Sequence, residues 1–114
     1  MGSAMFYGCS NLKSATLPAN SSITTLPKSF FYSCSNLTNL TLPQNITSID
    51  TQAFYSCSQM REYHLLSTVV ISLASTNAFN GIYSGCKIYV PASLETEYKN
   101  SSNWIALASY IQGE

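Results

Sequence analysis

Apolar side chains recur along this chain in an order that returns every 23 to 25 residues. Aligned on phenylalanine, the copies begin at Phe6, Phe31, Phe54 and Phe79, which are separated by 25, 23 and 25 residues. Within most copies an apolar residue occupies every third position after the phenylalanine, and mostly polar residues lie between. Self-similarity at this period predicts a repeat array in which each copy is one coil and equivalent positions stack.

The alignment also predicts which side chains point inward and where each coil forms a strand. The inward positions hold Cys9, Cys34, Cys57 and Ile82, then Leu12, Leu37, Met60 and Gly85, then Ala15, Leu40, Tyr63 and Ile88. The Leu-x-x-Leu-x-Leu spacing and the alternation at its end predict one short strand per coil, about 4.8 Å from its neighbours in a parallel sheet. The corner after the strand has Pro18, Pro43, Leu66 and Pro91.

The combined motif resembles the BspA-like, or Treponema-type, leucine-rich repeat, whose pattern is similar to Ala-Phe-x-x-Cys-x-x-Leu-x-x-Ile-x-Leu-Pro. Residues 31–43 and 53–57 carry it most fully, and residues 88–91 with Tyr98 and Trp104 resemble the family's usual ending. The resemblance implies an α/β repeat solenoid, a right-handed superhelix with short parallel strands and a C-terminal helical cap. It also implies a microbial surface or secreted parent protein that contacts host proteins or other cells.

We expect three parts in the chain. Residues 1–4 look like a vector remnant or a cut edge, residues 5–91 form the repeat array, and residues 92–114 form the helical cap. We expect Ser93 to be the N-cap of a helix that carries Glu95 and Glu97 near its positive end. Two short helices, broken near residues 100–103, should cover the last coil with a stripe of Leu94, Tyr98, Trp104, Ile105, Leu107, Ala108 and Ile111, in which Trp104 is the anchor.

The first coil has no comparable cover in the sequence. We therefore expect a fragment of a longer array, with some tendency to self-associate through Phe6, Cys9 and Leu12.

The repeated cysteines determine whether the chain could do chemistry. In the fourth copy Ile82 stands where the other copies have cysteine, and isoleucine can replace neither a metal ligand nor a nucleophile. Because free cysteine behaves as a small apolar group, we expect stacked, buried thiols. Disulfides between coils, a zinc site and a reactive thiol stay open as alternatives, although equivalent side chains point the same way, no Cys-x-x-Cys pair occurs and no activating base is evident. Cys86 lies outside this position.

Composition and charge narrow the function classes. The chain has 114 residues and a formal net charge of zero, and only 9% of its residues are charged, against about 25% in an average domain. Without a basic field or an apolar run of about 20 residues, we expect neither nucleic-acid binding nor membrane insertion. No pair of acidic residues has a reason to converge, and the single histidine, His64, should face solvent. We expect no catalytic residues, cofactor or metal.

The outward positions of the predicted sheet are the candidates for binding. Two side chains per strand face solvent and stack in columns on a face that many solenoids use for recognition. The candidates are Asn39, Thr41, Glu62, His64, Lys87 and Tyr89. Glu62 and Lys87 should be neighbours in one column and form a weak surface pair, and His64 should neighbour Tyr89 in the other.

These candidates predict a binding or adhesion module that recognises a protein, or a glycan. A purely structural spacer with a solvated face is the alternative, and a hydrolase fragment is a second one. We expect Tyr7, Tyr32 and Tyr55 to pack along the turn wall with their hydroxyl groups in water, with a binding stripe as the alternative.

Overall fold

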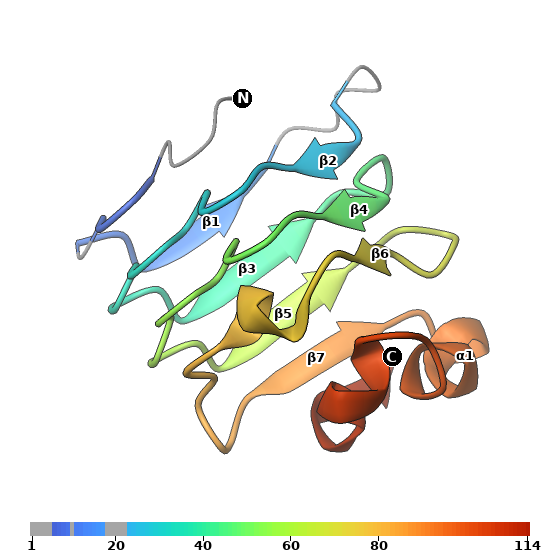
Figure 1. The fold of residues 1–114 in the computed structure, drawn as a ribbon. Coiled ribbons are helices and arrows are strands. Elements are labelled where there is room, and N and C mark those ends of the chain that lie inside the picture. Colours follow the sequence, from blue (N-terminus) through green and yellow to red (C-terminus); the bar gives the residue numbers. More distant parts are fainter. Residues whose placement is uncertain (1–5, 10, 18–22) are drawn as a thin grey trace.

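The computed structural model describes residues 6–9, 11–17 and 23–114, and Figure 1 draws the remainder as a grey trace. The expectations for residues 1–4 and for Pro18 lie outside the described residues. The strands are β1 (Ser14–Thr16), β2 (Thr25–Leu26), β3 (Asn39–Leu42), β4 (Ser48–Ile49), β5 (Glu62–Leu65), β6 (Ser72–Leu73), β7 (Lys87–Val90) and β8 (Ile111–Gly113). The helices are the 3-10 helices η1 (Thr76–Phe79), η2 (Ala92–Leu94) and η3 (Trp104–Tyr110), and α1 (Glu95–Lys99).

These strands form two open parallel sheets. The larger sheet has the order β1-β3-β5-β7-β8, and the smaller sheet has the order β2-β4-β6. Figure 1 shows the coils lying side by side, and each coil from the first to the third adds one strand to each sheet. The register places Ala15, Leu40, Tyr63 and Ile88 beside one another, which are the residues nine positions after each phenylalanine. The predicted parallel pairing and its alignment are therefore confirmed.

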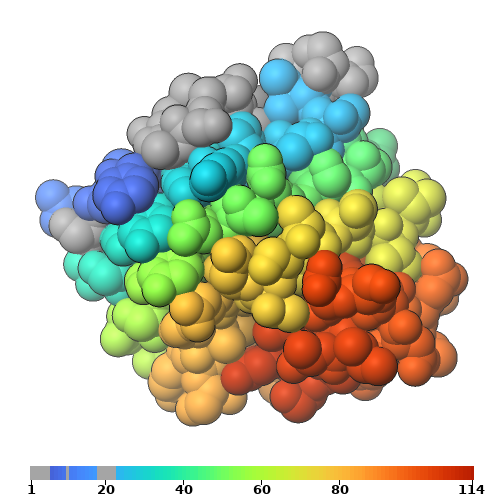
Figure 2. All heavy atoms as spheres, viewed as in Figure 1, coloured from blue at the N-terminus to red at the C-terminus, as the bar shows by residue number. Residues whose placement is uncertain are grey.

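Backbone hydrogen bonds continue between coils outside the strands. The Phe31 amide donates to the Ala53 carbonyl at 2.8 Å, and the Phe54 amide donates to the Ala78 carbonyl at 2.7 Å. The repeated phenylalanine rings also stack from coil to coil. From Phe6 to Phe79 the centroids of successive rings are 5.4, 5.8 and 5.2 Å apart. Figure 2 shows the coils as successive bands of colour packed without a break. Polar backbone pairing and apolar ring stacking thus fix the same register.

The thiols at the repeated position lie inside this stack, except in the first coil. Cys34 and Cys57 are buried, and their Sγ atoms donate to the carbonyls of Phe6 and Phe31 at 3.0 and 3.1 Å. Burial raises the pKa of Cys34 to about 11 and that of Cys57 to about 12. Cys9 is only half-buried, because its coil has no described coil on the outer side. All four cysteines are free.

The fourth coil departs from the aligned pattern. Gly85 was expected inward but is exposed, and Cys86, one residue later, is buried instead. A glycine has no side chain to fill the interior, so the neighbouring thiol occupies that space. Burial raises the pKa of Cys86 to about 12.

The C-terminal segment has the two expected short helices, α1 and η3, with the break at residues 100–103, but it differs from the prediction in other details. The Ser93 N-cap is wrong: Leu94 precedes α1 and makes no side-chain cap bond, although Glu95 and Glu97 do lie in the first turn. The chain after η3 forms β8, which extends the larger sheet and includes Ile111. Ile105, expected in the apolar stripe, is 61% exposed. The pattern of apolar and polar residues within this segment could not reveal β8, because its partner β7 lies more than 20 residues earlier in the chain.

Trp104 is buried where this segment meets the array. Its ring lies 5.6 Å from the ring of Phe79, and its Nε1 atom donates to the Ile71 carbonyl at 2.6 Å. The Tyr98 hydroxyl accepts a hydrogen bond from the Ile71 amide at 3.1 Å. Both aromatic groups therefore satisfy backbone groups of the third coil while they fill apolar space.

The turn after each phenylalanine requires a left-handed residue two positions on. Gly8, Ser33, Ser56 and Gly81 occupy this position with φ of 69°, 58°, 62° and 84°. Glycine adopts this conformation freely, whereas a side chain such as that of Ser33 makes it costly by roughly 1–2 kcal/mol.

We therefore expect Ser33→Gly to stabilise the protein by up to about 1 kcal/mol, because relief of the left-handed strain exceeds the added freedom of the unfolded chain. Ser58→Gly is the matched control, since Ser58 is an exposed turn residue without positive φ and should lose stability. Denaturant unfolding measures both changes. A Ser33→Gly variant no more stable than the wild type would contradict the argument.

Candidate binding groove on the sheet face

The six predicted binding residues lie together on the outward face of the larger sheet. Asn39, Glu62 and Lys87 are neighbours in register on β3, β5 and β7, and we call them the Asn39 column. Thr41, His64 and Tyr89 are neighbours in the same way, and we call them the Thr41 column. None of the six is fully buried. The sequence located this face correctly, and binding by it remains a prediction.

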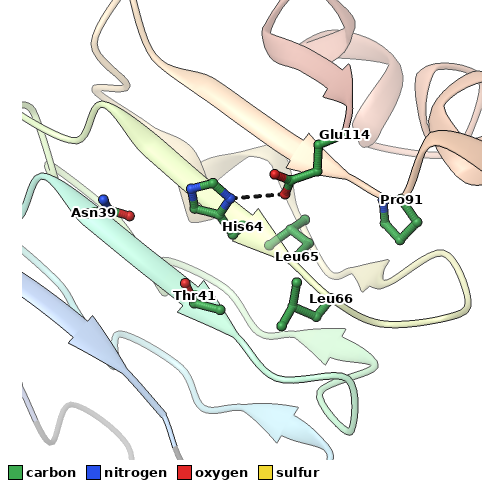
Figure 3. Close-up of a pocket in the computed structure, with 7 residues that line it drawn as sticks. All are labelled: Asn39, Thr41, His64, Leu65, Leu66, Pro91 and Glu114. Carbon is green, nitrogen blue, oxygen red and sulfur yellow. Dashed lines mark hydrogen bonds and ion pairs between the residues drawn. The ribbon is translucent and has the colours of Figure 1, made fainter.

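His64 is held between two carboxylates. Its Nε2 atom lies 2.8 Å from Glu62 Oε1, and its Nδ1 atom lies 3.0 Å from Glu114 Oε2, the contact drawn in Figure 3. A neutral imidazole has only one N–H group, so two carboxylate acceptors select the doubly protonated imidazolium. The expectation that acidic residues would not converge is therefore wrong. The side chain of His64 is also only 23% exposed, less than expected for a solvent-facing histidine.

The charged neighbours favour the protonated form of His64. Partial burial lowers the pKa of the imidazole, but the hydrogen bonds and charges of Glu114 and Glu62 outweigh this and leave the pKa raised above 6.5. Glu62 was expected to pair with Lys87, its neighbour in register. Among the described residues the ion pair of Glu62 is instead with His64.

Glu114 reaches His64 because β8 is fastened on both sides. On one side the Glu114 amide donates to the Val90 carbonyl at 2.9 Å. On the other side Glu95 Oε1 accepts from the Gly113 amide at 3.0 Å, while Glu95 Oε2 accepts from Lys99 at 2.8 Å. These two donors lower the pKa of Glu95. A Cβ at position 113 would lie 2.9 Å from the backbone Cα of Ala92, so the close approach of the two backbone segments requires glycine.

Beside His64 the face is hollowed into a shallow groove. It has a volume of about 510 Å³ and is lined by Asn39, Thr41, His64, Leu65, Leu66, Pro91 and Glu114. Figure 3 shows Asn39 and Thr41 on the strand next to His64, with Leu66 and Pro91 toward the far end of the strands. Leu66 is 46% exposed and replaces the proline of the other coils, a sequence signal that could have marked it. Glu114 lies outside the repeat, so no periodic signal could have placed it.

Aromatic stacking fixes the plane of the imidazole. The rings of His64 and Tyr89 are 5.1 Å apart and inclined by 13°. The ring of Tyr89 therefore covers the face of the imidazole that points toward β7.

The outer tyrosines form a second stack on the turn wall. Tyr7 and Tyr32 are 4.5 Å apart and inclined by 2°, and Tyr32 and Tyr55 are 4.7 Å apart and inclined by 5°. Each ring covers the face of its neighbour, so the packing prediction for these residues holds. Tyr7, at the end of the stack, is 57% exposed.

The chemistry available to the groove is recognition through hydrogen bonds, charge and ring stacking. Both nitrogens of His64 already contact carboxylates, so neither is placed to accept a proton from a substrate. Within residues 6–9, 11–17 and 23–114, no group of three or more His, Cys, Asp or Glu side chains is arranged to hold a metal ion. The described helices are all too short or too polar to cross a bilayer.

Comparison with known sequences agrees with the repeat pattern. The family model described as BspA type leucine-rich repeat region, in six copies, matches residues 1–103. No curated protein has a sequence that matches this chain.

We expect the measured pKa of His64 to lie above 6.5 and to fall in both Glu114→Gln and Glu62→Gln, because each removes a negative charge at the ring. NMR titration follows the one histidine of the chain directly. Glu97→Gln, on the exposed side of α1, is the matched control and should leave the pKa unchanged.

The raised pKa of His64 also makes the stability of the fold depend on pH. Because the folded-state pKa is raised, the two contacts stabilise the protein fully below the unfolded pKa of about 6.5 and lose this effect as pH rises through the folded pKa. A titration midpoint at or below 6.5, or one that Glu114→Gln leaves in place, would contradict the assignment.

Proposed function

Because this chain belongs to the BspA-type leucine-rich repeat family, we propose that it is a non-enzymatic binding or adhesion module that recognises a partner through the outward face of its larger sheet. The observation that carries the proposal is the groove with its in-register columns. Uncharged polar groups, an imidazolium and exposed apolar carbon lie within one hollow of about 510 Å³. Such a mixture gives directional contacts at a modest desolvation cost.

A protein is the favoured partner class, with a glycan as the second candidate. Repeat arrays present extended, rigid surfaces on which contacts from successive coils add up. The family resemblance further favours a parent protein that is secreted or held at a microbial surface, where the module would contact host proteins or other cells.

The proposal includes a right-handed solenoid whose C-terminal segment is a cap. On β8 the backbone amides that point away from β7 are already bonded: Gly113 donates to Glu95, and Ile111 donates to the Ala108 carbonyl. A strand with such an edge cannot accept another strand. The contact of Trp104 with Phe79 supports the same role.

We also propose weak self-association at the opposite end. Phe6, Cys9 and Leu12 are half-buried and line a groove of about 510 Å³ with Gly8 and Asn11. A second copy seated there would cover the apolar face of the first coil. Sedimentation at high concentration measures this association, and a monomer throughout would contradict it.

The competing function is a structural spacer without a ligand of its own. It would hold another domain away from a surface, and the columns would then only be solvated. A hydrolase has less support, because the described groove offers no nucleophile beside a free base.

Binding screens separate the module from the spacer. The wild type is tested on arrays of surface proteins and of glycans beside a triple variant, Asn39→Ala, Thr41→Ala and Lys87→Ala. A control variant, Thr47→Ala with Ser72→Ala, changes exposed residues at the smaller sheet. We expect a partner whose affinity falls by about tenfold or more in the triple variant only. No binding at all would favour the spacer. Equal binding by all three proteins would place the partner on another surface and would contradict recognition by the sheet face.

A further inference from the structure

The spacing between coils of this protein suits face-to-face rings. Ring centroids one coil apart are 4.5 Å apart for Tyr7 and Tyr32, and 5.1 Å apart for His64 and Tyr89. Offset or stacked aromatic pairs are favourable at such distances. A column that carries rings in neighbouring coils therefore forms a stack without further adjustment.

The Thr41 column is a stack with one position missing. Tyr89 on β7 and His64 on β5 carry rings, whereas Thr41 on β3 carries a short side chain. Because Tyr89 covers the β7 side of the imidazole, the other face of the ring points toward β3. The groove is lined by this ring and by Thr41, so the space of the missing ring is part of it (Figure 3).

When His64 is protonated, its open ring face carries positive charge. Glu62 and Glu114 hold the two nitrogens of His64 in the imidazolium form from the edge of the ring, and so leave its face free. A cation attracts the electron-rich face of an aromatic ring. It does not attract the weakly positive C–H groups by which a sugar packs on an aromatic residue, so the charge favours an aromatic ligand over a glycan.

The walls of the groove match an aromatic side chain with a polar tip. Leu66 and Pro91 provide exposed or half-buried carbon for the edge of a ring. Glu114 keeps a second carboxylate oxygen beyond the one that contacts His64, and Asn39 offers an amide oxygen. Either oxygen can accept a hydrogen bond from a phenol hydroxyl.

We propose that this groove binds an aromatic side chain of a protein partner, preferably a tyrosine, which stacks on His64 above Thr41 and completes the column. The inference rests on the proposed function, since it names the chemical group that the sheet face recognises.

Recognition by a charged ring depends on pH. The groups that face His64 are Glu62 on β5, Glu114 after β8, and Tyr89 on β7 with Lys87 nearby, while β3 contributes only the uncharged Asn39 and Thr41. As pH rises and the imidazolium loses its proton, the attraction for an aromatic face weakens. Affinity for the aromatic group should fall in the same pH range in which His64 titrates.

NMR of the intact chain tests the proposal with N-acetyl-tyrosinamide as the probe and N-acetyl-leucinamide as the matched control. We expect the tyrosine probe to move the ring C–H signals of His64 upfield in a saturable way, because of the ring current of a stacked aromatic group. The leucine probe should leave them in place. Thr41→Phe fills the missing position from within and should abolish the shift, whereas Ser72→Phe puts the same ring on the smaller sheet and should preserve it.

Equal shifts with both probes, no saturable shift with the tyrosine probe, or undiminished binding in Thr41→Phe would overturn the inference. A shift with a methyl glucoside in place of the tyrosine probe would also overturn it, and would leave the proposed function standing with a glycan partner. If the tyrosine probe fails while an array partner still depends on the face, only the present inference fails. If the probe binds but no array partner is found, only the proposed function fails.

Discussion

Backbone hydrogen bonds between successive coils impose the register on which the rest of the structure depends. They run both within the strands and outside them, as in the bond from the Phe31 amide to the Ala53 carbonyl. Once one residue of a coil is paired, every other residue of that coil has a fixed neighbour in the next. Identical positions must then tolerate the same surroundings, which is why Phe, Cys and Leu recur in the interior and why Ile82 can stand in for a thiol.

The same register produces the candidate site without any motif of its own. Outward residues of β3, β5 and β7 are brought into columns, and the aromatic part of one column ends at His64. The groove opens where the ring of His64 on β5 is followed by the short side chain of Thr41 on β3. Leu66, which replaces the proline of the other coils, adds exposed apolar carbon beside it. The shared repeat pattern therefore builds the sheet, and the residues that differ between coils form the groove on it.

Sequence reasoning was reliable where the period applied and failed where it did not. It predicted β1, β3, β5 and β7, their parallel pairing, the burial of Cys34 and Cys57 and the six residues of the sheet face, but not the second strand that each of the first three coils adds to the smaller sheet. It missed β8 and Glu114, because a strand that follows the repeat carries no copy of the pattern. Cys86 also escaped it, since only packing decides that a thiol fills the space that Gly85 leaves.

Thiol alkylation followed residue by residue in the native protein tests the central claim, that equivalent positions stack inside the body, most directly. Cys34 and Cys57, with pKa values of about 11 and 12, should react only when the protein unfolds. Cys9, on the outer side of the first coil, should react in the folded state. Rapid native-state labelling of Cys34 or Cys57, or the recovery of either in a disulfide, would contradict the account.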